Sequence, residues 1–142
     1  MRAMPPVTGQ PPKATDPAPA AGARAALSKA ERAFLDKLAA GQSVAALVRT
    51  GTTVDVGEWF RRGRVVGVCW GDEWVMFAVG RRPFVERIPT RALTASVYNH
   101  LVGELVLAPA PEARLKQLRM SPVEAGRVLR WMLSVCDEAV KQ

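Results

Sequence analysis

Residues 61–83 read RRGRVVGVCWGDEWVMFAVGRRP, with two apolar runs on either side of Gly71 and Asp72. Glycine at the first position of a two-residue loop suits the type II′ turn, so this stretch predicts a β-hairpin. In that hairpin Trp70 faces Glu73, and each step away from the turn pairs the next two residues outward. The hairpin therefore gathers at its open end the arginines that flank the apolar runs, which are Arg61, Arg62, Arg64, Arg81 and Arg82.

The hairpin belongs to a longer series of short β-prone runs over residues 43–108. Turn residues separate these runs, which are SVAALVR, TTVDV, RVVGVCW, EWVMFAV, FVERI, TASVYN and LVGELVL. Closely spaced strands with no helical stretch between them predict an antiparallel meander. Because many of the runs are apolar on both faces, we expect a strongly bent sheet with one face inside and the other partly covered by helices.

Two segments outside the strands carry helix signals. Ser28 and Glu31 form a capping box at the start of a short amphipathic helix, which ends at Gly41. Ser121 and Glu124 form a second capping box near the C-terminus. The helix that follows has one apolar stripe, made of Ala125, Val128, Leu129, Met132, Val135, Cys136 and Ala139. Such a stripe must pack against another element, and the sheet is the obvious partner.

We therefore expect one α+β domain over residues 26–142, built from a strongly bent antiparallel sheet or a small barrel. A short helix precedes the sheet and a capping helix follows it. Residues 113–118, ahead of the capping helix, are expected to contain one helical turn. Residues 1–25 are rich in proline and alanine and show no periodicity, which predicts a disordered tail.

Several β-runs followed by one capping helix resemble the bacterial pleckstrin-homology-like (PH-like) domain family over residues 27–140. Trp74 and Val75 depart from the family pattern, which usually has an arginine after the hairpin turn. The resemblance implies a PH-like barrel serving lipid binding, peptide binding or scaffolding, and the fold does not decide between these. The motifs that carry it are Gly41-Gln42, Gly71-Asp72, Ile88-Pro89 with Leu93 and Val97, and Gly103 with Leu105 and Leu107.

The chain is strongly basic, with a net charge of +7, and fifteen of its twenty basic residues are arginines. The guanidinium group binds the oxygens of phosphates and carboxylates in pairs, so the composition suits an anionic partner. Codon usage alone also produces arginine-rich chains, and that alternative stays open. The N-terminus lacks the apolar core of a secretory signal, and no window is apolar enough for a membrane span. These features favour a cytoplasmic protein that is peripheral to a membrane if it meets one.

The sequence offers few residues for catalysis. His100 is the single histidine and lies in a predicted turn, while Cys69 and Cys136 lie in apolar runs as expected for buried free thiols. A Cys69–His100 nucleophilic pair is the remaining enzyme alternative. No Cys or His spacing suits a metal, and no glycine-rich phosphate loop occurs. We therefore expect a non-enzymatic protein with no metal and no cofactor.

The candidate binding surface combines the five arginines with Trp59 and Phe60, which directly precede them. Exposed rings beside arginines suit nucleic acid or a bilayer interface, although burial in a core is the more common outcome for such rings. The leading prediction is a binding or scaffolding module that contacts an acidic protein segment or an anionic membrane surface. The alternative is a nucleic-acid-binding protein that uses the same surface. A solvated sheet end, with salt bridges to Glu58 and Glu86, is also consistent with the pattern.

Overall fold

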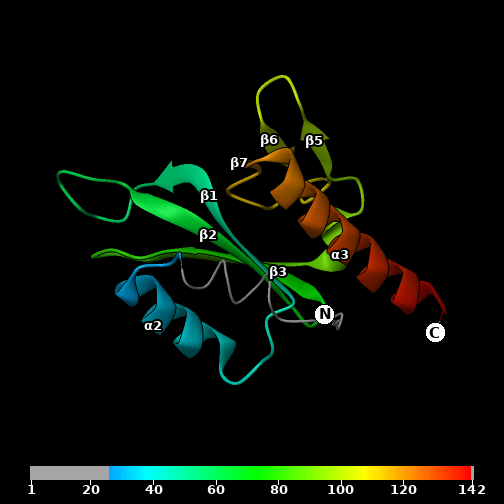
Figure 1. Cartoon of the computed structure of the whole chain (residues 1–142), viewed down its shortest axis with the longest axis horizontal. Helices are drawn as coiled ribbons and strands as arrows, with labels where there is room; N and C mark the ends of the chain where they lie inside the picture. The colour runs from blue at the N-terminus through cyan, green and yellow to red at the C-terminus, as the bar shows by residue number, and fades with distance from the viewer. Residues whose placement is uncertain (1–25, 142) are drawn as a thin grey trace, which may run out of the picture.

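The computed structural model describes residues 26–141, and the predicted tail over residues 1–25 lies outside them. The order of elements matches the predicted sequence of a helix, a series of strands and a final helix (Figure 1). The elements are α2 (Lys29–Ala39), β1 (Ala46–Val54), β2 (Gly63–Trp70), β3 (Glu73–Ala78), β4 (Phe84–Pro89), the 3₁₀ helix η1 (Thr90–Leu93), β5 (Val97–Asn99), β6 (Glu104–Val106), β7 (Gln117–Arg119) and α3 (Pro122–Lys141).

The strands form two antiparallel sheets, one of four strands in the order β1-β2-β3-β4 and one of three in the order β5-β6-β7. Figure 1 shows α2 against the larger sheet and α3 beside the smaller one. The β1–β2 loop and the β5–β6 loop project from the molecule in different directions (Figure 1). The predicted antiparallel α+β fold is confirmed. The two sheets do not close into a barrel, so the predicted PH-like barrel is not confirmed.

The predicted hairpin forms with the expected register. Trp70 faces Glu73, and the pairing continues outward to Val66 opposite Phe77. Gly71 has a φ of 55°, which is the left-handed backbone conformation that a type II′ turn needs at its first position. The hairpin is therefore confirmed from the turn to the middle of both strands.

Side chains of the larger sheet alternate between two cores, as the apolar runs predicted. Val66 and Val68 pack in one core with Leu35 of α2. Trp74 packs in the other core, which also contains Val128 of α3 and the buried side chains of the smaller sheet. Both capping boxes are present, since Ser28 with Glu31 and Ser121 with Glu124 exchange the expected hydrogen bonds. Helices thus cover both faces of a sheet that is apolar on both sides.

Two local predictions were wrong. Residues 113–118 contain no helical turn, and Leu118 lies in β7, fully buried between the exposed Gln117 and Arg119. The runs SVAALVR and TTVDV are not separate strands, because β1 continues through Gly51 with an irregular register. Alternation over three residues is too short to mark a strand in the sequence, and a glycine within a strand pattern can mark a bulge instead of an end.

Candidate functional site

The candidate site is the basic tip, defined as the β1–β2 loop (residues 55–62) and the β3–β4 loop (residues 79–83). Val56, in the first loop, is buried and joins the two loops. A Cβ atom on Gly63 would lie 2.6 Å from its Cγ1, and one on Gly80 would lie 2.3 Å from its Cγ2. No larger residue fits at either glycine without moving Val56. Because the two glycines have no side chains, Val56 can pack closely against both and hold the two loops next to each other.

Backbone hydrogen bonds fix the path of the β1–β2 loop. The Arg82 amide donates to the Val56 carbonyl at 2.7 Å, and the Gly57 amide donates to the Asp55 side chain at 2.8 Å. Gly57 has a φ of 79°, a conformation that glycine adopts without strain. The chain turns sharply here, so the residues that follow are carried away from the core.

Trp59 and Phe60 stand at the end of this turn and are 90% and 95% exposed. Their ring centroids are 6.1 Å apart and their planes are inclined by 53°. Burial in a core, which the sequence analysis gave as the more common outcome, does not occur. Val56 fills the apolar position between the loops, so the sheet leaves no place for either ring.

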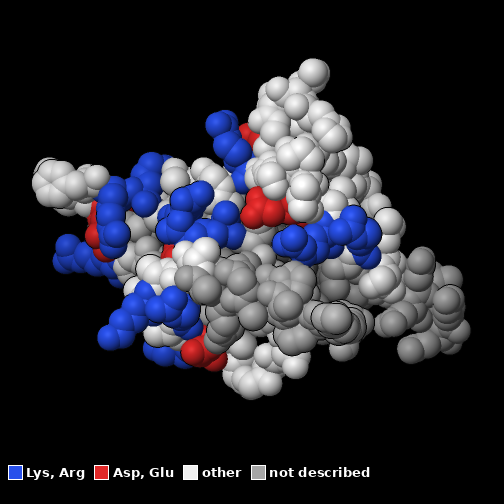
Figure 2. All heavy atoms as spheres, in the orientation of Figure 1, with Lys and Arg blue, Asp and Glu red and all other residues white. Residues whose placement is uncertain are grey.

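The basic tip contains four arginines and two acids, Asp55 and Glu58, and so keeps a net positive charge. Arg61 pairs with Glu58 at 3.4 Å, and that contact is exposed. Arg62 donates to the hydroxyl and carbonyl of Thr53, which carry no charge. Within the described residues, Arg81 and Arg82 have no carboxylate partner. Figure 2 shows Lys and Arg side chains gathered around the end of the molecule where the β1–β2 loop lies.

Arg64 and Glu86, the other two residues predicted to belong to the cluster, make their contacts elsewhere. Arg64 lies beside β1 rather than at the tip, since it faces Thr53 and its guanidinium donates to the Thr50 carbonyl. Glu86 does not compensate the arginines, because its carboxylate accepts from the backbone amides of Arg114 and Leu115 at 2.7 and 3.2 Å. Of the two acids predicted to balance the cluster, only Glu58 does so.

Two shallow hollows lie at the basic tip, and α2 lines one of them. One, of about 600 Å³, is lined by both rings of the tip together with Arg81. The other, of about 400 Å³, is lined by Arg61 together with Lys37 and Phe34 of α2. The contribution of α2 was not predicted, because the sequence of a helix does not indicate which loop the helix will lie beside.

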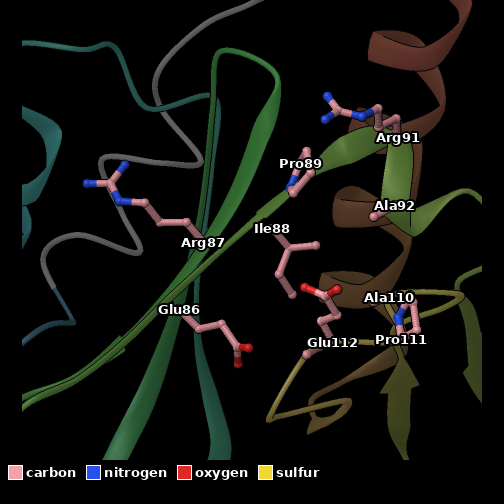
Figure 3. A pocket seen from close by; sticks show the side chains of 10 residues that line it. Glu86, Arg87, Ile88, Pro89, Arg91, Ala92, Ala110, Pro111 and Glu112 are labelled. Atoms are coloured by element: carbon pink, nitrogen blue, oxygen red, sulfur yellow. The ribbon is translucent and has the colours of Figure 1, made fainter.

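A further hollow, of about 380 Å³, lies between β4, η1 and residues 110–113 (Figure 3). Its two acids, Glu86 and Glu112, offset the charge of Arg87 and Arg91. Arg87 also pairs with Glu73 at 2.7 Å, and Figure 3 shows its side chain extending away from the other lining residues. With two acids and two arginines, the hollow has no excess charge to attract an ion.

The residues of the enzyme alternative are poorly placed for catalysis. Cys69 is fully buried in β2, and burial raises the pKa of its thiol, which disfavours the reactive thiolate. His100 is exposed in the β5–β6 loop and packs edge-on against Tyr98 at 4.8 Å. Within the described residues, no three His, Cys, Asp or Glu side chains gather as a metal site. Neither described helix has the length and apolar character needed to cross a bilayer.

Comparison of the chain with protein-family models, with curated proteins and with solved structures finds no match. The resemblance to PH-like domains therefore stays a prediction, and the functional argument depends on the geometry of the basic tip.

Proposed function

We propose that this protein is a non-enzymatic binding module that docks on an anionic membrane surface through the basic tip. The observation that carries the proposal is the near-complete exposure of Trp59 and Phe60 beside Arg81 and Arg82, which have no carboxylate partner within the described residues. Large rings this exposed have lost the hydrophobic stabilisation of burial, and a lipid interface restores it. Trp is enriched at the level of the lipid headgroups, where the arginines of the tip meet lipid phosphates.

The two kinds of side chain at the tip supply separate contributions to membrane binding. Each basic residue near an anionic leaflet contributes about 1 kcal/mol, and this attraction falls off within a Debye length. Complete burial of a ring such as Phe60 contributes about 1.5–3 kcal/mol. Stable membrane association generally takes two signals of this kind, because one alone gives marginal binding. The tip carries both within two neighbouring loops.

An acidic protein segment is the other partner named for this surface. It would pair with the same arginines, and Trp and Arg are common in protein interfaces. However, a protein partner must supply a cavity that matches the two rings, which stand 53° apart on a projecting loop. A bilayer interface receives a projecting apolar loop without such a match, and this favours the membrane.

Nucleic acid is the second candidate function, because rings beside arginines also stack on bases. Single-strand binders arrange their rings along a basic groove that follows the phosphate backbone. Here the two rings are consecutive residues at the end of one loop, and the hollow beside them is lined by a single arginine, Arg81. This arrangement favours insertion of the two rings into a bilayer interface over the stacking of bases along a groove.

The test is co-sedimentation of the full chain with vesicles of phosphatidylcholine alone or mixed with phosphatidylserine, at low and physiological salt. We expect binding to the anionic vesicles only, weakening as salt rises. Binding to a single-stranded oligonucleotide without binding to anionic vesicles would establish the second candidate instead. Binding to neither would contradict both.

The paired substitution Trp59→Ser with Phe60→Ser tests the rings without changing charge. We expect partitioning onto anionic vesicles to fall by about 100-fold, equivalent to about 2.7 kcal/mol, with thermal stability unchanged because both rings are exposed. The matched control is Val123→Ser with Leu133→Ser, which removes two exposed apolar side chains from α3 and should leave binding intact. Equal loss in both variants would show that the tip has no special role.

A further inference from the structure

A second exposed apolar loop lies between β5 and β6. Leu101 is 96% exposed and Val102 is 53% exposed, and neither belongs to a strand, although the sequence run LVGELVL suggested one. Exposed neighbouring apolar side chains need an explanation beyond packing. No side chain of the described residues covers Leu101.

This loop is held in a defined conformation. The Leu101 amide donates to the Asn99 side chain at 3.0 Å, and the Gly103 amide donates to the Asn99 carbonyl at 2.9 Å. Gly103 has a φ of 71°, and its carbonyl accepts from the Met120 amide at the end of β7. The loop thus presents its apolar side chains on a fixed turn.

A series of contacts connects this loop with the basic tip along β1. Between Arg49 and Thr53 the strand covers four steps while its partner β2 covers two, from Val66 to Arg64, so β1 bulges there. The bulge brings the Thr52 hydroxyl to the Arg119 amide of β7, which donates to it at 2.7 Å. The smaller sheet, with its apolar loop, is therefore joined to the strand that leads into the tip.

Three arginines lie along this connection, and we call them the arginine flank: Arg62, Arg64 and Arg119. Arg62 and Arg64 donate to backbone carbonyls of β1. The Arg119 side chain crosses Gly51, where an added Cβ would lie 3.3 Å from its Cδ. None of the three has a carboxylate partner within the described residues, although Glu104 faces Arg119 across the ladder. Figure 2 shows Lys and Arg side chains between the two projecting loops.

We propose that the β5–β6 loop is a second membrane anchor and that the arginine flank faces the bilayer between the two anchors. This inference rests on the proposed function. An apolar loop at each end and uncompensated arginines between them match the layers of an anionic bilayer, whose charged headgroups cover an apolar interior. Two anchors joined through β1 allow the protein one orientation on the membrane. With the basic tip as the single anchor, the protein could still rotate about the direction in which the tip inserts.

The first test is the paired substitution Leu101→Ser with Val102→Ser, measured by co-sedimentation with phosphatidylserine-containing vesicles. We expect partitioning to fall about tenfold, with an unchanged thermal midpoint because both side chains lie outside the cores. Wild-type binding by this variant, alongside weak binding by the Trp59→Ser, Phe60→Ser variant, would overturn the second anchor and leave the proposed function intact. Failure of the unmodified chain to bind would overturn both.

The second test places a polarity-sensitive fluorophore beside the loop at His100→Cys in a Cys136→Ser background. Cys69 is fully buried and its thiol pKa is raised, so it should not react with the label. We expect a blue shift on adding anionic vesicles, and loss of that shift when Leu101→Ser and Val102→Ser are added. A label at Ser134→Cys on α3 should not respond. A bound protein whose label at position 100 stays in water would contradict the proposal.

Discussion

Replacing Arg61, Arg62, Arg81 and Arg82 together by serine is expected to lower partitioning onto anionic vesicles by about three orders of magnitude. Four basic residues at about 1 kcal/mol each amount to roughly 4 kcal/mol, and each 1.4 kcal/mol is a tenfold change. The fold should persist, because all four side chains are exposed and the one ion pair lost, Arg61 with Glu58, is a surface contact. Co-sedimentation at physiological salt measures the loss, and a thermal melt verifies the fold.

The control must remove the same charge elsewhere. A second quadruple variant, with serine at Arg91, Lys116, Arg127 and Arg130, takes the net charge of +7 to +3, as the first variant does. We expect it to keep most of the binding, because attraction to a charged surface is screened beyond about 8 Å at physiological salt. Equal losses in the two variants would mean that binding follows net charge alone. The gathering of arginines at the tip would then have no functional meaning.

Local rules were sufficient to predict the hairpin at the centre of the fold. The Gly71-Asp72 turn and the alternating cores depend on residues close together in the chain, so turn chemistry and strand period identify them. The same holds for both capping boxes, where a side chain bonds the backbone three residues away. The predicted gathering of arginines followed from the turn alone, and Arg61, Arg62, Arg81 and Arg82 lie in the two loops at the open end of the hairpin.

What the sequence did not predict depends on contacts between distant segments. The rings of Trp59 and Phe60 are exposed because Val56 occupies the space between Gly63 and Gly80, seventeen positions apart in the chain. Arg64 lies in β2 near the open end of the hairpin, but a bulge in β1 takes its guanidinium to the Thr50 carbonyl, a contact that the turn alone does not predict. No local pattern reveals which of several apolar residues fills a gap between two loops.

The sheet of β5, β6 and β7 was predicted only in part, for a different reason: the runs TASVYN and LVGELVL contain β5 and β6, whereas β7 lies where a helical turn was expected. Its three strands have three residues each; β6 and β7 each have one fully buried side chain, Leu105 and Leu118, and β5 has none. At most one buried residue per strand leaves no period to detect. The run LVGELVL therefore predicts one strand, whereas the turn at Gly103 leaves Leu101 and Val102 outside β6 and exposed. The two residues to which we assign the second anchor thus lie in an apolar run whose sequence does not distinguish them from buried strand residues.

A single methyl group at Gly67 is expected to have the largest effect on stability. A Cβ atom there would lie 2.2 Å from Cη2 and 2.5 Å from Cζ2 of Trp74, which is fully buried. Because the tryptophan has no free space to enter, Gly67→Ala should lower the free energy of unfolding by about 3 kcal/mol. Gly51→Ala is the matched control within a strand, since its neighbour at 3.3 Å is the exposed Arg119 side chain, which can move. Denaturant unfolding of both variants measures the difference.

A double-mutant cycle with Trp74→Phe identifies the cause of that loss. Phenylalanine lacks the Cη2 and Cζ2 atoms that obstruct a methyl group at Gly67, so the alanine should fit in its presence. The indole Nε1 of Trp74 has no hydrogen-bond partner within the part of the chain that the structure describes, so no hydrogen bond is lost with it. We expect Gly67→Ala to cost less than about 1 kcal/mol in the Trp74→Phe background, a coupling of about 2 kcal/mol. Additive effects would show that Gly67 is required for its backbone and not for the space it leaves to the tryptophan.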